Sequence, residues 1–211
     1  MDKLPWLGAS VKRKEDDRLL RGSGRFLDDV EETLTLHVAV GRCPYPHARI
    51  RSIDVTRALG HSGVEAVLTG QQVVARTEAI TALRPFAGSA PTAFYGMAQE
   101  VARYEGEPVV AVAAVDRYVA EDALELIDID YEPLPHVVTV EDALRPGAPQ
   151  LHATVPSNVV VESTVRAGEP DRRLADATVT VEGTFRINRV SGAPIETRGV
   201  IARWAAARPR R

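Results

Sequence analysis

The stretch Pro108-Val109-Val110-Ala111-Val112-Ala113-Ala114-Val115 decides the fold, because it is an unbroken apolar run with the length of one strand. Such a run is typical of a strand that is buried on both faces. Asp116 follows as a candidate helix cap, and the next residues are apolar at helical spacing. Residues 127–132 then alternate until Pro133, which predicts a second strand after the helix. If the two strands are parallel, the crossover between them is expected to be right-handed.

Shorter elements are expected before this unit. Residues 34–40 and 48–55 alternate between apolar and polar or small side chains, which predicts two half-buried strands. The other elements expected here are a strand at 64–68, short helices at 56–60 and 69–74, and a long loop at 77–96.

The N-terminal residues 1–21 form a polar arm with a short helical piece near Glu15–Leu20. The basic run Lys12-Arg13-Lys14 is followed at once by Glu15-Asp16-Asp17, which indicates a solvated arm held by salt bridges. An arm that docks a partner is the alternative. Gly22-Ser23-Gly24 ends the arm, and it lacks the preceding strand that a phosphate-binding turn requires.

The C-terminal third is expected to begin with an extended, Pro-rich linker at 137–157. Two strands at 158–166 and 178–187 are expected after it, with a short helix at 169–177 between them. Gly192–Ala202 then predicts a strand, a turn and a new strand, with Glu196 and Arg198 at the bend. Because the two charged residues are two apart, they would share one face of a strand and could form an ion pair; substrate contact is the alternative.

Composition excludes several classes of protein. A chain of 211 residues with 45% hydrophobic and 26% charged residues can build an ordinary globular core. The net charge of −3 and the isoelectric point near 6.0 argue against nucleic-acid binding. No apolar run approaches the roughly 20 residues that cross a bilayer, and the N-terminus lacks a signal peptide, so no membrane contact and a cytoplasmic location are expected. The single cysteine, Cys43, cannot form an intramolecular disulfide or hold an iron–sulfur cluster, which would have to lie on another chain.

No catalytic, cofactor-binding or metal-binding residue is expected in this chain. Cys43 is expected to be a small packed residue, and the acidic group Asp28-Asp29 and Glu31-Glu32 a solvated turn, because its spacing does not match a cation loop. The histidines show no i, i+3 or i, i+4 pairing and are expected in packing or surface roles; they are His37, His47, His61, His136 and His152.

Segments along most of the chain, in order and with matching spacing, resemble one family of enzymes. It is the molybdopterin-binding large subunits of xanthine dehydrogenase, aldehyde oxidase and aerobic carbon monoxide dehydrogenase. The segments that carry the resemblance are Val11–Gly22, Gly24–Asp29, Gly41–Asp54, Gly63–Gly70, Gly106–Val109 and Ala120–Pro135.

The resemblance implies an α+β chain. It places an N-terminal arm at 1–21, an α/β-hammerhead domain at 22–136, a linker at 137–157 and the incomplete start of a molybdopterin-binding domain at 158–211. In such enzymes a molybdenum ion on a pyranopterin dithiolene oxidises carbon monoxide or inserts a water-derived oxygen into a C–H bond. Electrons then leave through iron–sulfur and FAD-containing subunits or domains, which are the partners implied for this chain.

The same resemblance implies that the cofactor loops and the general-base Glu lie beyond these residues. The chain is therefore expected to supply a scaffold and a docking surface and to be inactive alone, either as a truncated product or as a split subunit. The segment His47-Ala48-Arg49 would lie near the cofactor domains, or Arg49 would anchor a neighbouring loop. The alternatives are a non-catalytic interaction module and the product of a truncated gene without function. We further expect the hammerhead segment to fold alone and the strands at 158–166 and 178–187 to expose an apolar face that promotes self-association.

Overall fold

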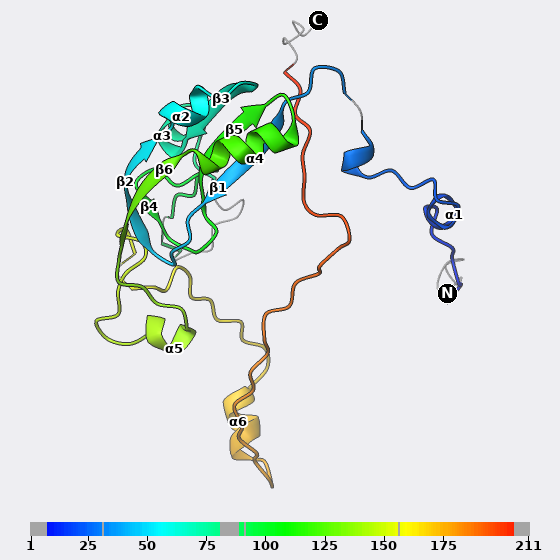
Figure 1. Cartoon of the computed structure of the whole chain (residues 1–211). Helices are drawn as coiled ribbons and strands as arrows, with labels where there is room; N and C mark the ends of the chain where they lie inside the picture. The colour runs from blue at the N-terminus through cyan, green and yellow to red at the C-terminus, as the bar shows by residue number, and fades with distance from the viewer. Residues whose placement is uncertain (1–7, 31, 81–88, 91, 156, 205–211) are drawn as a thin grey trace, which may run out of the picture. The chain divides into compact units, whose positions relative to one another are not determined.

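The computed structural model describes residues 8–30, 32–80, 89–90, 92–155 and 157–204. The chain divides into two units (Figure 1). One unit is Thr35–Ala177, and the other combines the two ends of the chain, Met1–Leu34 and Thr178–Arg211.

The unit Thr35–Ala177 is built on two three-stranded sheets whose strand pairs are all antiparallel. The first sheet has the order β1 (His37–Arg42), β5 (Pro108–Ala114), β3 (Val64–Thr69). The second has the order β4 (Val101–Ala102), β2 (Ala48–Asp54), β6 (Asp128–Pro133). Consecutive strands therefore alternate between the sheets, since the first sheet holds β1, β3 and β5 and the second holds β2, β4 and β6.

The central strand β5 carries the core, as its unbroken apolar run predicts. Val109, Val110 and Val112 are fully buried. On the neighbouring strand β1, a Cβ added at Gly41 would lie 2.6 Å from Val110 Cγ1. Because this contact is closer than side-chain carbons tolerate, the absence of a side chain at Gly41 allows the two strands and the helix above them to pack closely.

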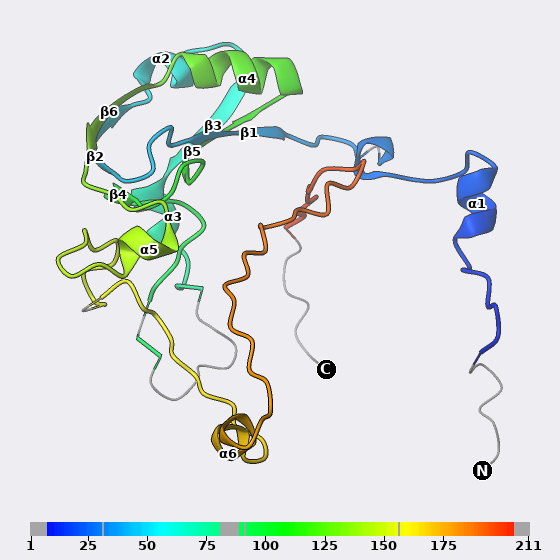
Figure 2. The same ribbon diagram turned by 90° about the horizontal axis from the view of Figure 1, so that it is seen from below.

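Helix α4 (Arg117–Glu125) covers the sheet formed by β1, β5 and β3. Asp116 caps it, because its Oδ1 accepts a hydrogen bond from Val119 N at 2.8 Å. Its own residues Ala120 and Ala123 are buried. The short helix α2 (Thr56–Leu59) contacts α4, and Figure 2 shows the two side by side. The expected strand at 108–115 and the capped amphipathic helix after it are thus confirmed.

The two strands of this segment do not form a parallel pair. The strands β5 and β6 lie in different sheets, so the condition for a right-handed parallel crossover is not met. The physical reason is that β1 and β3 already occupy both edges of β5. Strand β6 instead pairs with β2, from Ala48↔Pro133 to Asp54↔Asp128.

The other elements expected before β5 are found with small shifts. The first strand begins at His37 and not at Leu34, whose φ of 61° is incompatible with extended backbone. Helix α3 (Gly70–Val74) follows β3 as expected. In the expected loop 77–96, Ile80 and Phe94 form an antiparallel bridge, with Ile80 N donating to Phe94 O at 2.6 Å, and residues 81–88 and 91 lie outside the described residues.

The segment 137–157 contains a helix, α5 (Val140–Ala143), where an extended linker is expected. Thr139 caps this helix, since its Oγ1 accepts a hydrogen bond from Asp142 N at 3.1 Å. Asn158 then fastens the segment, because its Nδ2 donates to Ala143 O at 3.2 Å and to Pro149 O at 3.0 Å. Capping and side-chain hydrogen bonds therefore fold this segment in spite of its prolines.

The strands expected at 158–166 and 178–187 are not formed; within the described residues neither segment joins a sheet. The short helix between them is confirmed as α6 (Pro170–Ala175). In the second segment the apolar positions are almost fully exposed, from 77% at Val179 to 93% at Ile187. An alternating segment becomes a strand only when a neighbour completes its hydrogen bonds, and no such neighbour lies among the residues that the structure describes.

The unit formed by the chain ends contains the short helix α1 (Asp16–Leu20) and the single turn η1 (Leu27–Asp29). Ion pairs join Arg13 to Asp16 at 2.8 Å and Arg21 to Asp17 at 2.9 Å. These contacts confirm the arm held by salt bridges. Across the described part of the chain, no helix combines the length and the apolar character that spanning a membrane requires.

Candidate functional site

The turn that follows β1 is fastened to the turn that precedes β5. Cys43 N donates to Glu107 O at 2.9 Å, and Gly106 N donates to Cys43 O at 2.8 Å. Arg42 Nη1 also donates to Gly106 O at 2.9 Å. Gly106 has a φ of 88°, a left-handed conformation that favours glycine. The three hydrogen bonds fix the position of Glu107 at the start of the buried strand.

Cys43 is packed, as expected, with 1% of its surface exposed. Burial is the main cause that raises the pKa of its thiol, and the nearby Glu107 charge adds to the rise. A backbone hydrogen bond with Tyr45 acts in the opposite direction on this pKa. A thiol with a raised pKa is mostly protonated at neutral pH and is a poor nucleophile.

Tyr131 on β6 lies beside this turn, and its ring meets Tyr45 edge-on at a centroid distance of 5.6 Å. Its hydroxyl oxygen is buried and has no hydrogen-bond partner among the described residues. Burial is the main cause that raises the pKa of Tyr131 to about 12, with smaller contributions from Cys43 and Tyr45. An unsatisfied buried hydroxyl is costly, so this position is a weak point of the core.

The segment His47-Ala48-Arg49 anchors its own neighbourhood. His47 is 8% exposed, and its Nδ1 lies 2.7 Å from Pro135 O. Leu134 N donates to His47 O at 2.9 Å. Arg49 forms an ion pair with Glu132 at 3.4 Å across the β2–β6 pair. The hydrogen bonds of His47 thus hold the backbone that follows β6, whereas Arg49 pairs with a side chain on β6 itself.

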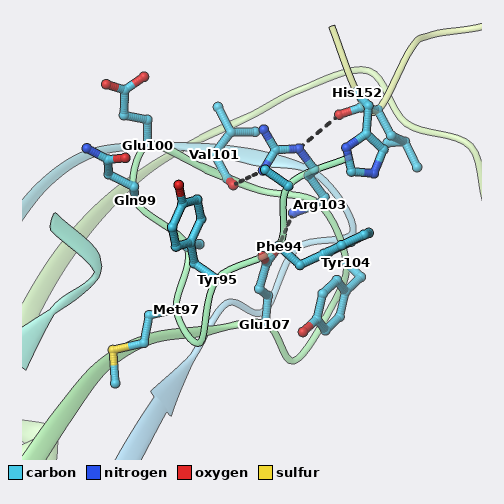
Figure 3. A pocket seen from close by; sticks show the side chains of 13 residues that line it. Phe94, Tyr95, Met97, Gln99, Glu100, Val101, Arg103, Tyr104, Glu107 and His152 are labelled. Atoms are coloured by element: carbon cyan, nitrogen blue, oxygen red, sulfur yellow. Dashed lines mark hydrogen bonds between the residues drawn. The ribbon is translucent and has the colours of Figure 1, made fainter. Parts of the chain in front are cut away.

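A cavity of about 340 Å³ lies within the same unit, between the loop before β4 and the segment after α5 (Figure 3). Three aromatic side chains line it, Phe94, Tyr95 and Tyr104. Two charged residues from the turn before β5, Arg103 and Glu107, also line it. This combination of rings and charged groups in one concave site is typical of a ligand pocket.

Arg103 joins the distant parts of the cavity wall. Its Nε donates to Leu151 O at 3.1 Å and its Nη1 to Val101 O at 3.2 Å. Its backbone N donates to Glu107 Oε2 at 2.5 Å. Glu107 is only 9% exposed, so this carboxyl group is buried at the cavity.

His152 completes the wall, with its ring edge-on to Phe94 at a centroid distance of 5.5 Å. The pKa of His152 is lowered from 6.5, first by burial and then by the charges of Arg103 and His47. The imidazole is therefore neutral at pH 7 and adds no positive charge to the cavity.

Sequence reasoning did not identify this cavity. His152 is one of the scattered histidines, and Arg103 carries no motif. The available signal is the charged, aromatic run Arg103-Tyr104-Glu105-Gly106-Glu107 directly before a fully apolar strand. Its meeting with Leu151 and His152 depends on tertiary contacts that local patterns do not encode.

The ion pair expected between Glu196 and Arg198 is not formed. Glu196 Oε1 instead accepts a hydrogen bond from Leu27 N at 2.5 Å. Gly199 lies against the Leu27 side chain, which leaves no room for a Cβ there. Both contacts lie within the unit formed by the chain ends, so Glu196 binds the backbone at the start of η1.

The other candidates take part in local contacts. Asp29 Oδ2 accepts from Phe26 N at 2.8 Å, which fits a turn; Glu32 pairs with Arg203, and Glu31 lies outside the described residues. His37 and His136 are exposed, and His61 is half-buried. Within the described ranges, no three residues of the His, Cys, Asp and Glu types come together as metal ligands would.

Comparison with known proteins decides the family. Residues 21–135 match the family described as "Aldehyde oxidase and xanthine dehydrogenase, a/b hammerhead domain". This chain belongs to that family. Residues 151–210 of this family member also match the molybdopterin cofactor-binding domain. The mixed α/β hammerhead fold and the partial molybdopterin-binding domain implied by the resemblance are thus confirmed.

Relatives among curated proteins are large subunits of molybdenum hydroxylases. The nicotine 6-hydroxylase large subunit of Paenarthrobacter nicotinovorans is 34% identical over 93% of this chain and 24% of its own length. The carbon monoxide dehydrogenase large chain of Afipia carboxidovorans is 32% identical over 93% of this chain and 25% of its own length. The chain thus spans about a quarter of the length of these relatives.

Solved structures agree with this placement. Quinoline 2-oxidoreductase from Pseudomonas putida 86 matches with a TM-score of 0.72 and 40% identity, over 81% of this chain and 22% of that one. The aldehyde oxidoreductase from Desulfovibrio gigas matches with a TM-score of 0.71 and 28% identity, over 81% of this chain and 19% of that one.

Proposed function

We propose that these 211 residues are the N-terminal scaffold and subunit-docking portion of a molybdenum hydroxylase large subunit. The observation that carries the proposal is the pair of matches in one order, hammerhead at 21–135 and molybdopterin cofactor-binding domain at 151–210. These matches also support a division into an arm at 1–21, a hammerhead at 22–136, a linker at 137–157 and the start of a cofactor domain at 158–211.

The cofactor of the complete enzyme is molybdopterin with molybdenum, and iron–sulfur and FAD groups are carried by partner subunits. The relatives' own names describe subunits of larger assemblies, such as the gamma subunit of the 6-hydroxypseudooxynicotine dehydrogenase complex. The proposed location is the cytoplasm.

The residues described here do not fit the cofactor by themselves. A pterin requires a cradle that surrounds it, whereas Phe185, Val190 and Ile195 in the cofactor-domain segment are 90–101% exposed. No catalytic step is therefore assigned to this chain, and its proposed roles are to hold the fold and to dock other polypeptide. Isolated 211-residue chain is expected to be inactive.

The test is to produce the 211-residue chain in a host that synthesises molybdopterin, and to measure its metal, pterin and activity. Molybdenum by mass spectrometry and pterin by fluorescence should be far below one per chain. Oxidation of carbon monoxide, aldehydes and purines should be absent. The carbon monoxide dehydrogenase large chain, prepared in the same way, is the positive control for insertion. Stoichiometric molybdenum with turnover in the short chain would overturn the proposal.

Docking is tested by co-expression with iron–sulfur and flavin subunits of the same assembly. Co-purification of the 211-residue chain with either subunit supports the docking role. Failure to bind both subunits, from a chain whose circular dichroism shows a folded hammerhead, would refute it.

A further inference from the structure

The cavity beside β4 combines a buried carboxyl group with three partly exposed aromatic rings. The exposed fractions are 47% for Phe94, 36% for Tyr95 and 51% for Tyr104, against 9% for Glu107. Ring faces carry negative potential and attract cations, and a nearby carboxylate strengthens this attraction. Figure 3 shows the ring of Tyr95 on one side of Glu107 and the ring of Tyr104 on the other.

The Glu107 carboxyl group has capacity for a further partner. Its Oε2 accepts the hydrogen bond from Arg103 N, and within the described part of the chain its Oε1 takes part in no hydrogen bond or ion pair. Hydrogen bonds between a cationic donor and a carboxylate are stronger than those between neutral groups. Because Glu107 lines the cavity, a cationic group placed there would pair with Oε1.

The other charged groups around the cavity do not prevent a cation from binding beside Glu107. The guanidinium of Arg103 is held by Leu151 O and Val101 O, and Figure 3 shows it beside Val101 and the backbone that carries His152. Burial lowers the pKa of His152, which is neutral at pH 7. Glu100 adds a second carboxyl group to the lining.

We propose that this cavity binds a small organic cation, with its ammonium group on Glu107 and its apolar body against Tyr95 and Tyr104. The volume of about 340 Å³ lies near the lower end of ordinary ligand pockets, roughly 300–1,000 Å³, and suits one ring with a short charged arm. This site is separate from the proposed scaffold role and does not depend on it.

The binding test is saturation-transfer NMR with the full chain, a method that tolerates self-association of the protein. Benzylammonium is the probe, and benzyl alcohol and benzoate are its neutral and anionic counterparts. Benzylammonium should bind at least about tenfold more tightly than either. Tighter binding of benzoate would show that Arg103 governs the cavity and would overturn the proposal. N-acetyl-lysine amide tests a polypeptide lysine as the source of the cation, and its preference over benzylammonium would overturn the small-molecule assignment.

Substitutions locate the site. Glu107→Gln keeps the shape and the acceptor for Arg103 N but removes the charge, so benzylammonium should bind about tenfold more weakly or worse. Glu105→Gln is the matched control, because Glu105 is an exposed carboxyl in the same turn that does not line the cavity. Equal affinities of the two variants, with unchanged thermal unfolding, would refute the proposal.

A second variant keeps the proposal testable if Glu107→Gln does not fold. Tyr104 is half exposed, so Tyr104→Leu should leave the fold intact. Loss of one cation–π contact should weaken benzylammonium binding about two- to fivefold and leave benzyl alcohol binding nearly unchanged. An equal loss for both probes would indicate apolar packing alone and contradict the cation site.

Discussion

Strand β1 and the segment 178–187 share an alternating pattern, yet only the first becomes a strand. Residues 37–42 pair with β5 from His37↔Ala114 to Arg42↔Pro108. Residues 178–187 pair with no strand in the part of the chain that the structure describes, and Phe185 and Ile187 are at least 90% exposed. Alternation thus indicates which faces a strand would have, whereas a neighbouring strand decides whether it forms.

The two regions differ in how many of their strands and apolar side chains find partners. The unit Thr35–Ala177 contains its own paired strands and buried core. The segment Thr178–Trp204 contributes exposed apolar side chains and contacts Leu27 and Glu32 within the unit formed by the chain ends. Substitutions should therefore be costly in the first region and nearly silent for stability in the second.

The largest contrast is expected between two glycine substitutions. A Cβ at Gly70 would collide with the backbone of Ala98, whereas a Cβ at Gly192 would meet nothing within 4 Å. Gly70→Ala should lower the free energy of unfolding by about 3 kcal/mol or prevent folding, because backbone must move. Gly192→Ala should change it by less than about 0.5 kcal/mol. Urea unfolding followed by circular dichroism measures both, and a tolerated Gly70→Ala would contradict this packing.

A smaller contrast concerns two helix starts. Asp116 accepts a hydrogen bond from Val119 N at the start of α4, whereas Glu169 at the start of α6 makes no side-chain cap. Asp116→Ala should cost about 1 kcal/mol of unfolding free energy. Glu169→Ala should leave the unfolding of the same unit unchanged, since α6 buries no residue. Equal effects of the two substitutions would mean that α4 is not fastened as described.

Removal of the Tyr131 hydroxyl should stabilise the core slightly. This buried group has no hydrogen-bond partner among the described residues, so Tyr131→Phe should raise the unfolding free energy by up to about 1 kcal/mol. Tyr45→Phe is the control, because Tyr45 is 37% exposed and should show no gain.

The pKa of Tyr131 near 12 lies above its usual value of 10.0, so wild-type chain should lose stability from this group as pH rises from 10 towards 12. Tyr131→Phe should lack that part of the loss, and a destabilised variant would show that the hydroxyl has a partner.

The smallest effect on stability is expected in the segment Thr178–Trp204. The double substitution Phe185→Asp with Ile187→Asp should leave the thermal unfolding of Thr35–Ala177 unchanged, because both side chains are at least 90% exposed. It should, however, reduce self-association of the isolated chain, measured by sedimentation velocity, because it removes exposed apolar area. A monodisperse wild-type monomer would contradict the expected self-association directly.

Local patterns predict much of the unit Thr35–Ala177. The strands at 48–55, 64–68 and 108–115 and the helix capped by Asp116 follow from periodicity and a cap residue, which depend on neighbours in sequence. The sheet to which each strand belongs does not follow, because it depends on the distant strands with which β5 and β6 pair.

The same limit applies to the cavity. Arg103 meets Leu151 through the folded segment around α5, and Asn158 helps to fasten that segment. The proline-rich composition of segment 137–157 predicts an extended linker. Side-chain hydrogen bonds from Asn158 and Thr139 overrode that preference, and the carboxyl of Glu107 became buried as a result of contacts made elsewhere.

The interleaved pairing of β1 with β5 and of β2 with β6 has a consequence for biosynthesis. During translation the earlier strands leave the ribosome long before their partners, and the second sheet cannot close until residue 133 has emerged. Such non-local topology favours slow folding and prolonged exposure of unpaired edges. The nascent hammerhead should therefore depend on chaperone protection until residue 133 has emerged and its strands can pair.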